Sequence, residues 1–389
     1  MGALDELKQV YRRRDQRARA WKAAGGKVVG HFGGGTPEAL IAAAGLMPYQ
    51  IAGDPTAGST AIERHLLPVF NKAQSSRGLL ELEMVASMLE QLFGGGLDFL
   101  DYLVIPNSRK EIAQIHTHLR DARIADPSLA LPQVHFLDSA ASRTYAASAF
   151  DRRKILQFKV VLEGWVGAPI NPDALEEALV ADVENRLLLA AFGVRRREKP
   201  ARILGTTALA VHGASRFMPK DEHSQLLATA LDEINSLPER EGVRLFVAGS
   251  PLDHAGLYQM IESLPAVVVG EDYAWGEALA EPLLSNDPDP IEAIAEHYHR
   301  IAPAMTSPIE ADARRCAERA LRCGAEAAVV WVSRHDDLQL FTAPDQIAAL
   351  EAAGVPCLYL SEQPYRVDPA SGIGDQIAAF LASRPERRS

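Results

Sequence analysis

Cysteine is scarce in this chain: only Cys316, Cys323 and Cys357 occur among 389 residues, too few for a disulfide framework. Long apolar runs are also lacking. There is no uninterrupted stretch of about 18 apolar residues, so the sequence predicts no membrane span. Blocks of basic residues are lacking as well. With a formal net charge of −11, the chain does not offer the positive surface that nucleic-acid binding requires.

The composition is that of an ordinary globular protein. Hydrophobic residues make up 47% and charged residues 23%, and 389 residues are enough for two domains with separate cores. Residues 1–14 have the pattern of a charged amphipathic helix and lack the apolar segment of a signal peptide, so we expect a cytoplasmic protein. We expect the three cysteines to be buried structural thiols, because free cysteine is among the most buried residue types.

A glycine-rich stretch organises the N-terminal part of the sequence. Residues 27–30 favour a short buried strand, residues 33–35 a turn, and residues 36–44 a helix with Thr36 at its N-cap and Glu38 in its first turn. The backbone N–H groups of such a turn can hold a carbonyl, carboxylate or phosphate, because no side chain blocks the approach. The alternative is a tight turn without a ligand, since the pattern matches neither a dinucleotide fingerprint nor a Walker loop.

Strands and helices alternate along two parts of the chain, which predicts parallel sheets. The expected strands are 27–30, 49–52, 102–106 and 134–138 in the first part, and 243–249, 266–270, 327–332 and 355–360 in the second. We therefore expect an α/β fold of two doubly wound parallel-sheet domains, Rossmann-like or flavodoxin-like, joined by a helical segment. The expected divisions are a leading helix (1–24), a first α/β domain (25–138), a helical segment and linker (139–200) and a second α/β domain (201–389).

Side chains near the carboxyl ends of the strands are the first candidates for function, because ligands of open parallel sheets bind there. The candidate acid and base groups are His31, Asp272, Tyr273, His335, Asp336 and Glu362. A carboxylate with a histidine can work as general base and acid, and His335 beside Asp336 is the most suggestive group. The alternative is an ordinary solvated loop, and the group lacks a recognisable spacing of metal ligands. Trp275 is expected in the core, at an interface or as the floor of a pocket.

Several segments resemble one known family. The opening stretch WKAAGGKVVGHFGGGTPEALIAAAGLMP resembles the start of the 2-hydroxyacyl-CoA dehydratase and benzoyl-CoA reductase family. Later in the chain, VRLFVAGSPLDHAGLYQMIESLPAVVVGEDYAWGE is similar to a strand–helix–strand unit of that family. The stretches GAEAAVVWVSRHDD and LEAAGVPCLYLSEQPY resemble its last two strands. The resemblance therefore covers nearly the whole chain and implies common ancestry and fold.

The resemblance fails at the metal ligands. Members of that family usually hold a [4Fe–4S] cluster on three cysteines from different loops, and these positions align with Ala73, Ser108 and Asp336 here. A serine alkoxide is a poor substitute for a thiolate, and cluster iron prefers sulfur donors. None of the surviving cysteines follows the strands that should present the ligands. We therefore expect no cluster bound by this chain alone.

The substrate loop also departs from the family. Gly34 stands where the family often carries a serine, so a hydroxyl contact to the thioester is lost, whereas the N–H groups of Gly34 and Gly35 still donate to an oxyanion. The expected substrate-binding residues are Gly33, Gly34, Gly35, Thr36, Glu38, Arg77, Ser108, Tyr273, Trp275 and Glu362. The expected catalytic residues are His31, Asp272, His335 and Asp336.

Three functions stay open at this point. In the family, an ATP-hydrolysing activator protein delivers an electron to the cluster and then to an acyl-CoA. The first hypothesis is a cluster-free subunit that shapes the acyl-CoA site beside a related subunit carrying the [4Fe–4S] cluster. The second is a stand-alone enzyme with acid/base chemistry on a thioester or carboxylate substrate. The third is a regulatory protein that binds acyl-CoA without catalysis.

Overall fold

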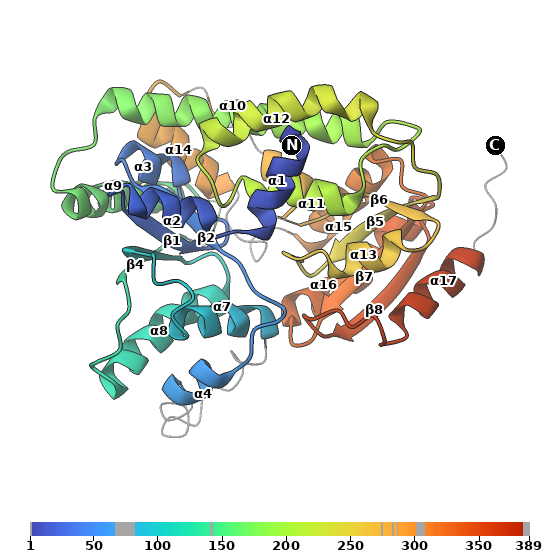
Figure 1. Ribbon diagram of the computed structural model, residues 1–389, viewed down its shortest axis with the longest axis horizontal. Helices are drawn as coiled ribbons and strands as arrows, with labels where there is room; N and C mark the ends of the chain where they lie inside the picture. Colours follow the sequence, from blue (N-terminus) through green and yellow to red (C-terminus); the bar gives the residue numbers. More distant parts are fainter. Residues whose placement is uncertain are drawn as a thin grey trace.

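Two four-stranded parallel sheets form the centre of the fold (Figure 1). The computed structural model describes residues 2–66, 82–140, 142, 144–273, 275–281, 284–285, 287–300 and 308–383. The first sheet has the order β2-β1-β3-β4 and consists of β1 (Val28–Phe32), β2 (Met47–Ile51), β3 (Tyr102–Pro106) and β4 (Gln133–Leu137). The second has the order β6-β5-β7-β8 and consists of β5 (Val243–Gly249), β6 (Ala266–Glu271), β7 (Ala327–Ser333) and β8 (Cys357–Gln363). All neighbouring strands are parallel, which confirms the expected fold class.

Strands β1, β3, β5, β6 and β7 form where the sequence is largely apolar, whereas the edge strands β4 and β8 carry polar residues and are only partly buried. β1 and β6 are buried along their whole length, as expected for parallel strands that are covered on both faces. One boundary matters for function. β1 continues through His31 and Phe32, so His31 lies within the strand and not after it. Its side chain is buried in the sheet.

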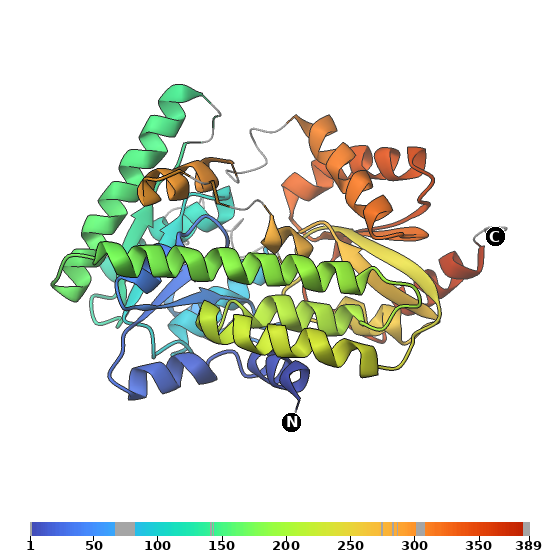
Figure 2. The same ribbon diagram turned by 90° about the horizontal axis from the view of Figure 1, so that it is seen from above.

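Both sheets share one strand order, and this order fixes where a ligand can bind. In each sheet the chain starts at an inner strand, moves to one side and then returns to the other, so the order reverses between β1 and β3 and between β5 and β7. Such a reversal opens a crevice at the carboxyl ends of the two strands. The two lobes lie side by side in Figures 1 and 2, with β1–β4 in one and β5–β8 in the other.

Helices cover the sheets and connect them. In the first half these are α3 (Glu38–Ala43), α4 (Thr60–His65), α7 (Glu83–Phe93), α8 (Lys110–Ala125) and α9 (Tyr145–Val166). The middle holds α10 (Pro172–Arg196), α11 (Gly205–Ala214), α12 (Lys220–Glu233) and the 3-10 helix η1 (Ile234–Ser236). The second half holds α13 (Gly256–Glu262), η2 (Glu277–Ala280), α14 (Pro290–Arg300), α15 (Ile309–Arg322), α16 (Asp337–Ala352) and α17 (Ile373–Ser383). Among the described helices, none is both long and apolar enough to cross a membrane.

The long helix α10 runs across both lobes (Figure 2). Its start is capped, because the Asn171 side chain accepts a hydrogen bond from the Asp173 N–H at 3.0 Å and Pro172 occupies the first turn. Farther along, α10 packs against α3 of the first lobe and against η2 of the second. The helix therefore joins the lobes as one continuous element.

The expected single leading helix is wrong. The chain forms α1 (Ala3–Arg12) and α2 (Gln16–Ala23), separated by a turn. α1 packs on α11 and α12, and the Glu233 carboxylate accepts hydrogen bonds from the N–H groups of Ala3 at 2.7 Å and Leu4 at 3.1 Å. A carboxylate at a helix N-terminus satisfies free N–H groups and complements the helix dipole. The first helix is thus bound to an element far away in the sequence.

The expected cap at Thr36 is absent. α3 begins at Glu38 with Pro37 at the N-cap, and the buried Thr36 hydroxyl has no hydrogen-bond partner in the described structure. α8 also begins without a side-chain cap, at Lys110. In the loop before α8 the Asn107 amide donates to the Asp138 carboxylate at 2.9 Å, so this side chain connects two strand ends instead of capping the helix.

Helix α16 contains an internal proline. It begins at Asp337 and includes Pro344. Asp336 caps it, because its carboxylate accepts a hydrogen bond from the Gln339 N–H at 3.3 Å.

A buried carboxylate joins the two lobes. Asp253, fully buried after β5, accepts hydrogen bonds from the Gly53 N–H at 2.6 Å and from the Tyr365 hydroxyl at 2.5 Å. Its backbone carbonyl accepts from the Tyr11 hydroxyl at 2.7 Å and from the Arg14 guanidinium at 2.5 Å. Gly53 belongs to the first lobe, whereas Asp253 and Tyr365 belong to the second. The contacts around Asp253 therefore set the relative position of the lobes.

We expect the free energy of unfolding to decrease as the pH falls from about 6.5 to about 4. Burial lowers the pKa of His31 and His212 to about 4 and that of His223 to about 3. In this window the unfolded chain binds protons that the folded chain does not, so stability is lost by about 1.4 kcal/mol per pH unit for each proton. Urea unfolding at about pH 7 and about pH 5 measures the change. Equal free energies at both pH values would contradict it.

Candidate functional site

A cleft of about 640 Å³ lies where the two crevices face each other. The loops after β1, β3, β4, β5 and β6 and the start of α16 line it, with residues 33–36, 106–112, 137–139, 249, 251, 272–273, 275 and 337–339. One face of α10 contributes Asp182, Asn185, Arg186 and Leu189. This volume is in the range of about 300–1,000 Å³ that is typical of small-molecule and cofactor sites. The position follows from the strand order of both sheets.

The glycine turn after β1 forms part of the cleft wall. Gly33 and Gly35 have positive φ angles of 71° and 102°, a conformation that other residues rarely adopt. A side chain at Gly34 would meet no atom within 4 Å, whereas a Cβ at Gly35 would lie 3.4 Å from the Cβ of Ser108. The turn is therefore close to the loop after β3. All five of the residues expected here, Gly33, Gly34, Gly35, Thr36 and Ser108, line the cleft.

Glu38 lies in the cleft wall between three basic side chains. One carboxylate oxygen is 2.8 Å from Lys220 Nζ, and the other is 3.4 Å from His31 Nε2 and 3.9 Å from Arg216 Nη1. Burial raises the pKa of Glu38, but the attraction by Lys220 and the other bases outweighs it and lowers the pKa to about 2. Glu38 is therefore ionised, while burial keeps His31 neutral at pH 7. Of these four, His31 lies behind the cleft wall.

The loop after β6 brings three expected residues to the cleft. Asp272 pairs with Arg319 at 2.5 Å, and burial raises the pKa of Asp272 although this arginine opposes the shift. The Tyr273 hydroxyl lies 2.5 Å from the Tyr258 hydroxyl. Trp275 lies under Arg216, whose guanidinium carbon is 5.6 Å from the ring centre. Trp275 thus forms part of the cleft wall, one of the roles expected for it.

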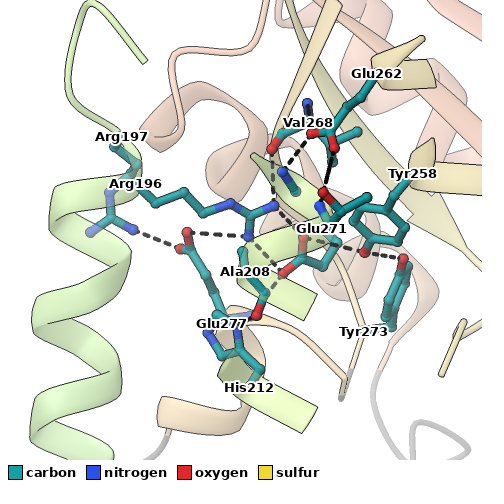
Figure 3. Close-up of polar contacts among 12 residues, drawn as sticks. Arg196, Arg197, Ala208, His212, Tyr258, Glu262, Val268, Glu271, Tyr273 and Glu277 are labelled. Carbon is teal, nitrogen blue, oxygen red and sulfur yellow. Dashed lines mark hydrogen bonds and ion pairs between the residues drawn. The ribbon is translucent and has the colours of Figure 1, made fainter. Parts of the chain in front are cut away.

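A buried ion pair fixes this loop. Figure 3 shows Arg196 of α10 reaching the Glu271 carboxylate at the end of β6, with Glu277 beside it. Arg196 donates to the two carboxylate oxygens of Glu271 at 2.9 and 2.8 Å, and both side chains are buried. Glu271 also accepts from the Glu277 N–H at 3.1 Å. The Glu271 carboxylate, at one end of the loop that carries Asp272 and Trp275, therefore binds the backbone of Glu277 at the other end. Arg196 of α10 holds this carboxylate in place.

Asp336 lies in a bridge between three strand ends. Its buried carboxylate accepts hydrogen bonds from Arg109 at 2.8 Å and from the Ser250 hydroxyl at 2.8 Å, besides capping α16. His335 and Glu362 are exposed, have positive φ angles of 63° and 56°, and do not line the cleft. Arg77 and Ala73 lie outside the described residues.

The sequence did not predict a further acid–base pair, of which one residue lines the cleft. Asp151 of α9 lines the cleft, and its carboxylate oxygen is 2.7 Å from Nδ1 of His299 on α14. The other oxygen accepts from the Ala140 N–H at 2.7 Å. The two residues are 148 positions apart and neither follows a strand, so the rule of strand ends does not find them. Lys220, the first residue of α12, also follows no strand and was not expected at the cleft.

Comparison with known proteins shows to which family the chain belongs. The family model described as 2-hydroxyglutaryl-CoA dehydratase, D-component, matches residues 34–382. The chain belongs to this dehydratase family. The resemblance seen in the sequence is thus confirmed for its dehydratase part. The likeness to benzoyl-CoA reductase stays a prediction.

Three relatives of the dehydratase family show how low the sequence identity to this chain is. The beta subunit of (R)-phenyllactyl-CoA dehydratase from Clostridium sporogenes is 22% identical over 338 residues, covering 85% of both chains. The beta subunit of lactoyl-CoA dehydratase from Anaerotignum propionicum is 22% identical over 386 residues, covering 98% of this chain and 97% of the relative. The beta subunit of (R)-2-hydroxyglutaryl-CoA dehydratase from Acidaminococcus fermentans is 22% identical over 350 residues, covering 86% and 87%. All three are subunits of acyl-CoA dehydratases.

The thiols of this dehydratase-family chain lie in the hydrophobic core of the second lobe. Cys316 and Cys323 are buried and Cys357 is half-buried, which agrees with their expected structural role. Burial raises the pKa of Cys323 and of Cys357 to about 12 and also raises that of Cys316. Among the described residues that line the cleft there is no cysteine.

Replacing Glu271 should destabilise the fold strongly. Glu271→Gln removes the nearer carboxylate of the buried Arg196 guanidinium and leaves only Glu277 at 3.9 Å, so we expect a loss of about 3 kcal/mol in the free energy of unfolding. Glu198→Gln is the control, because Glu198 is an exposed residue that pairs with the half-buried Arg195 at 3.3 Å, and we expect a loss below about 1 kcal/mol. Urea unfolding of both variants measures the difference. Similar losses would show that the buried pair does not fix the loop.

Proposed function

We propose that this chain is the cluster-free subunit of an acyl-CoA-processing enzyme and binds the acyl-CoA in the cleft between its lobes. The observation that carries the proposal is the cleft itself, which lies at the carboxyl ends of both sheets and is lined by the glycine turn. The names of the three relatives support it, since each is a beta subunit that acts with an acyl-CoA. The partner in this proposal is a related subunit that carries the [4Fe–4S] cluster.

The residues at the aligned ligand positions do not fit a cluster. Ser108 offers a hydroxyl, and the Asp336 carboxylate already accepts hydrogen bonds from Arg109, Ser250 and the start of α16. Cluster iron prefers thiolates, and the three thiols of the chain lie in the core with raised pKa values. We therefore derive no step through a cluster in this chain. The partner subunit, an ATP-dependent activator protein and a cytoplasmic location remain predictions from the sequence.

In the proposed role, the chain positions the acyl-CoA. The N–H groups of Gly34 and Gly35 donate to the thioester oxygen, because their bare backbone forms the cleft surface. Lys220 and Arg216 supply positive charge next to the turn, moderated by Glu38. Trp275 gives an apolar wall. These groups orient and polarise a thioester without transferring an electron themselves.

Filling the cleft should abolish acyl-CoA binding without unfolding the protein. Gly34→Phe places a ring in the cleft at a position where a Cβ meets no atom within 4 Å. We expect affinity for butyryl-CoA, measured by isothermal titration calorimetry, to fall at least about tenfold, which is about 1.4 kcal/mol. Gly58→Phe is the matched control, because Gly58 has equally open space and lies outside the cleft wall. Equal affinity of the two variants would contradict binding in the cleft.

The cluster-free assignment is tested by metal analysis. We expect iron and acid-labile sulfide well below one cluster per chain when the protein is expressed alone and purified without oxygen, because thiolate ligands do not face the cleft. A near-stoichiometric cluster would show that the aligned ligand positions are wrong. Buried Cys316→Ala serves as a control, since iron bound to the core thiols would decrease in that variant.

A stand-alone enzyme with acid/base chemistry is the second candidate, and the Asp151–His299 pair favours it. A carboxylate on Nδ1 fixes the tautomer of an imidazole and leaves Nε2 to exchange a proton. Turnover of an acyl-CoA by the purified chain alone would support this candidate. Binding without turnover, also in the presence of a partner subunit, would favour the regulatory hypothesis instead.

A further inference from the structure

Asn185 combines a buried position with a place in the cleft wall. It lies near the middle of α10, is only 2% exposed and lines the cleft. A side-chain amide has two donor hydrogens on Nδ2 and two acceptor lone pairs on Oδ1, and burying either side without a partner costs free energy. The hydrogen bonds that Asn185 makes within the protein therefore show which side of the amide is left for a ligand.

The donor side of this amide is directed to α12, the helix that packs along α10 (Figure 1). Nδ2 of Asn185 lies 2.7 Å from His223 Nδ1, 3.0 Å from Ser224 Oγ and 3.4 Å from the Lys220 carbonyl oxygen. His223 and Ser224 are buried themselves, so these contacts lie between the two helices. Nδ2 thus has acceptors for both of its hydrogen atoms.

The imidazole of His223 fixes the orientation of the amide. His223 Nε2 lies 3.0 Å from the Val211 carbonyl oxygen, which can only accept, so Nε2 carries a hydrogen atom. Burial lowers the pKa of His223 to about 3, so the ring is neutral at pH 7 and its Nδ1 is an acceptor. The atom of Asn185 that faces Nδ1 must therefore be the donor Nδ2. The reverse orientation would place two acceptors against each other.

The amide oxygen is left as an acceptor at the cleft. Among the described residues none donates a hydrogen bond to Asn185 Oδ1. Because Nδ2 faces α12 and the residue lines the cleft, Oδ1 is the atom of the amide that a ligand can reach. Gln346 Oε1, by contrast, is sealed in the interior without a partner. A role in joining α10 to α12 explains the donor side of Asn185 and leaves its oxygen unexplained.

We propose that Asn185 is a specificity-determining residue whose Oδ1 accepts a hydrogen bond from an O–H or N–H group of the ligand. The inference rests on the proposed binding of an acyl-CoA in the cleft. Such a ligand has two sources of a donor: a hydroxyl on the acyl group, and the amide and hydroxyl groups of the pantetheine arm that all CoA esters share. His223 and Ser224 are positioning residues, because they hold the amide in the orientation that presents the oxygen.

Isothermal titration calorimetry with three CoA esters tests the proposal and identifies the donor. 2-Hydroxybutyryl-CoA and 3-hydroxybutyryl-CoA carry a hydroxyl on the acyl group, whereas butyryl-CoA does not. If the acyl hydroxyl is the donor, one hydroxy ester binds the wild-type chain about tenfold more tightly than butyryl-CoA, because an unpaired buried acceptor is costly. Asn185→Leu then removes this preference and keeps the affinity for butyryl-CoA. If the pantetheine arm is the donor, Asn185→Leu weakens all three esters by the same factor of about ten.

Gln346→Leu is the matched control. Gln346 is also a buried amide, 7% exposed, whose oxygen has no partner among the described residues, and it does not line the cleft. We expect this variant to bind every ester with the affinity of the wild-type chain. Asn185→Ala is the second variant in case Asn185→Leu does not fold, because water in the space that it leaves can bond to His223 and Ser224.

The outcomes separate this inference from the function on which it rests. Ester binding that neither Asn185 variant weakens would overturn the role of the amide oxygen and leave the proposed function standing. An equal loss of affinity in Gln346→Leu would also overturn it, because the effect would then come from the loss of any buried amide. A wild-type chain that binds none of the three esters would overturn the proposed function, and this inference with it.

Discussion

The buried carboxylate of Asp253 is the constraint on which the cleft depends. Taking a carboxylate out of water costs several kcal/mol, and only donors held in fixed positions offset this cost. Here the donors come from both lobes: the Gly53 backbone on one side and the Tyr365 hydroxyl on the other. The lobes can therefore adopt few relative positions without losing these bonds. The Arg109–Asp336 pair, which also crosses between the lobes, adds to this restriction.

The sheets could be predicted because their information is local. The run AVVVG at 266–270 is apolar throughout and rich in β-branched residues, as is typical of a covered parallel strand. The glycine turn and Trp275 could be placed at the site because they follow such strands. Lys220, Arg216 and Asp151 could not, since helical segments from distant parts of the chain bring them to the cleft. His31 was misplaced because β1 continues beyond its most apolar residues.

Polar groups at the strand ends of the cleft hold one another in place. The Arg196–Glu271 pair and the bridge around Asp336 are made of protein groups that stabilise one another. Asp336, at a position that the resemblance aligned with a cluster ligand, makes hydrogen bonds that connect three loops. A change at Asp336 would therefore alter the geometry of these loops.

Helix α10 also limits how the cleft can open. It is a 25-residue helix, about 37 Å long, that packs on α3 in one lobe and on η2 in the other while its inner face lines the cleft. A rigid rod fixed at both ends prevents a hinge motion that would bend it. Motions of the lobes that leave α10 straight are not opposed in this way. The part of the cleft wall that α10 forms, with Asp182, Asn185, Arg186 and Leu189, therefore keeps its shape in such motions.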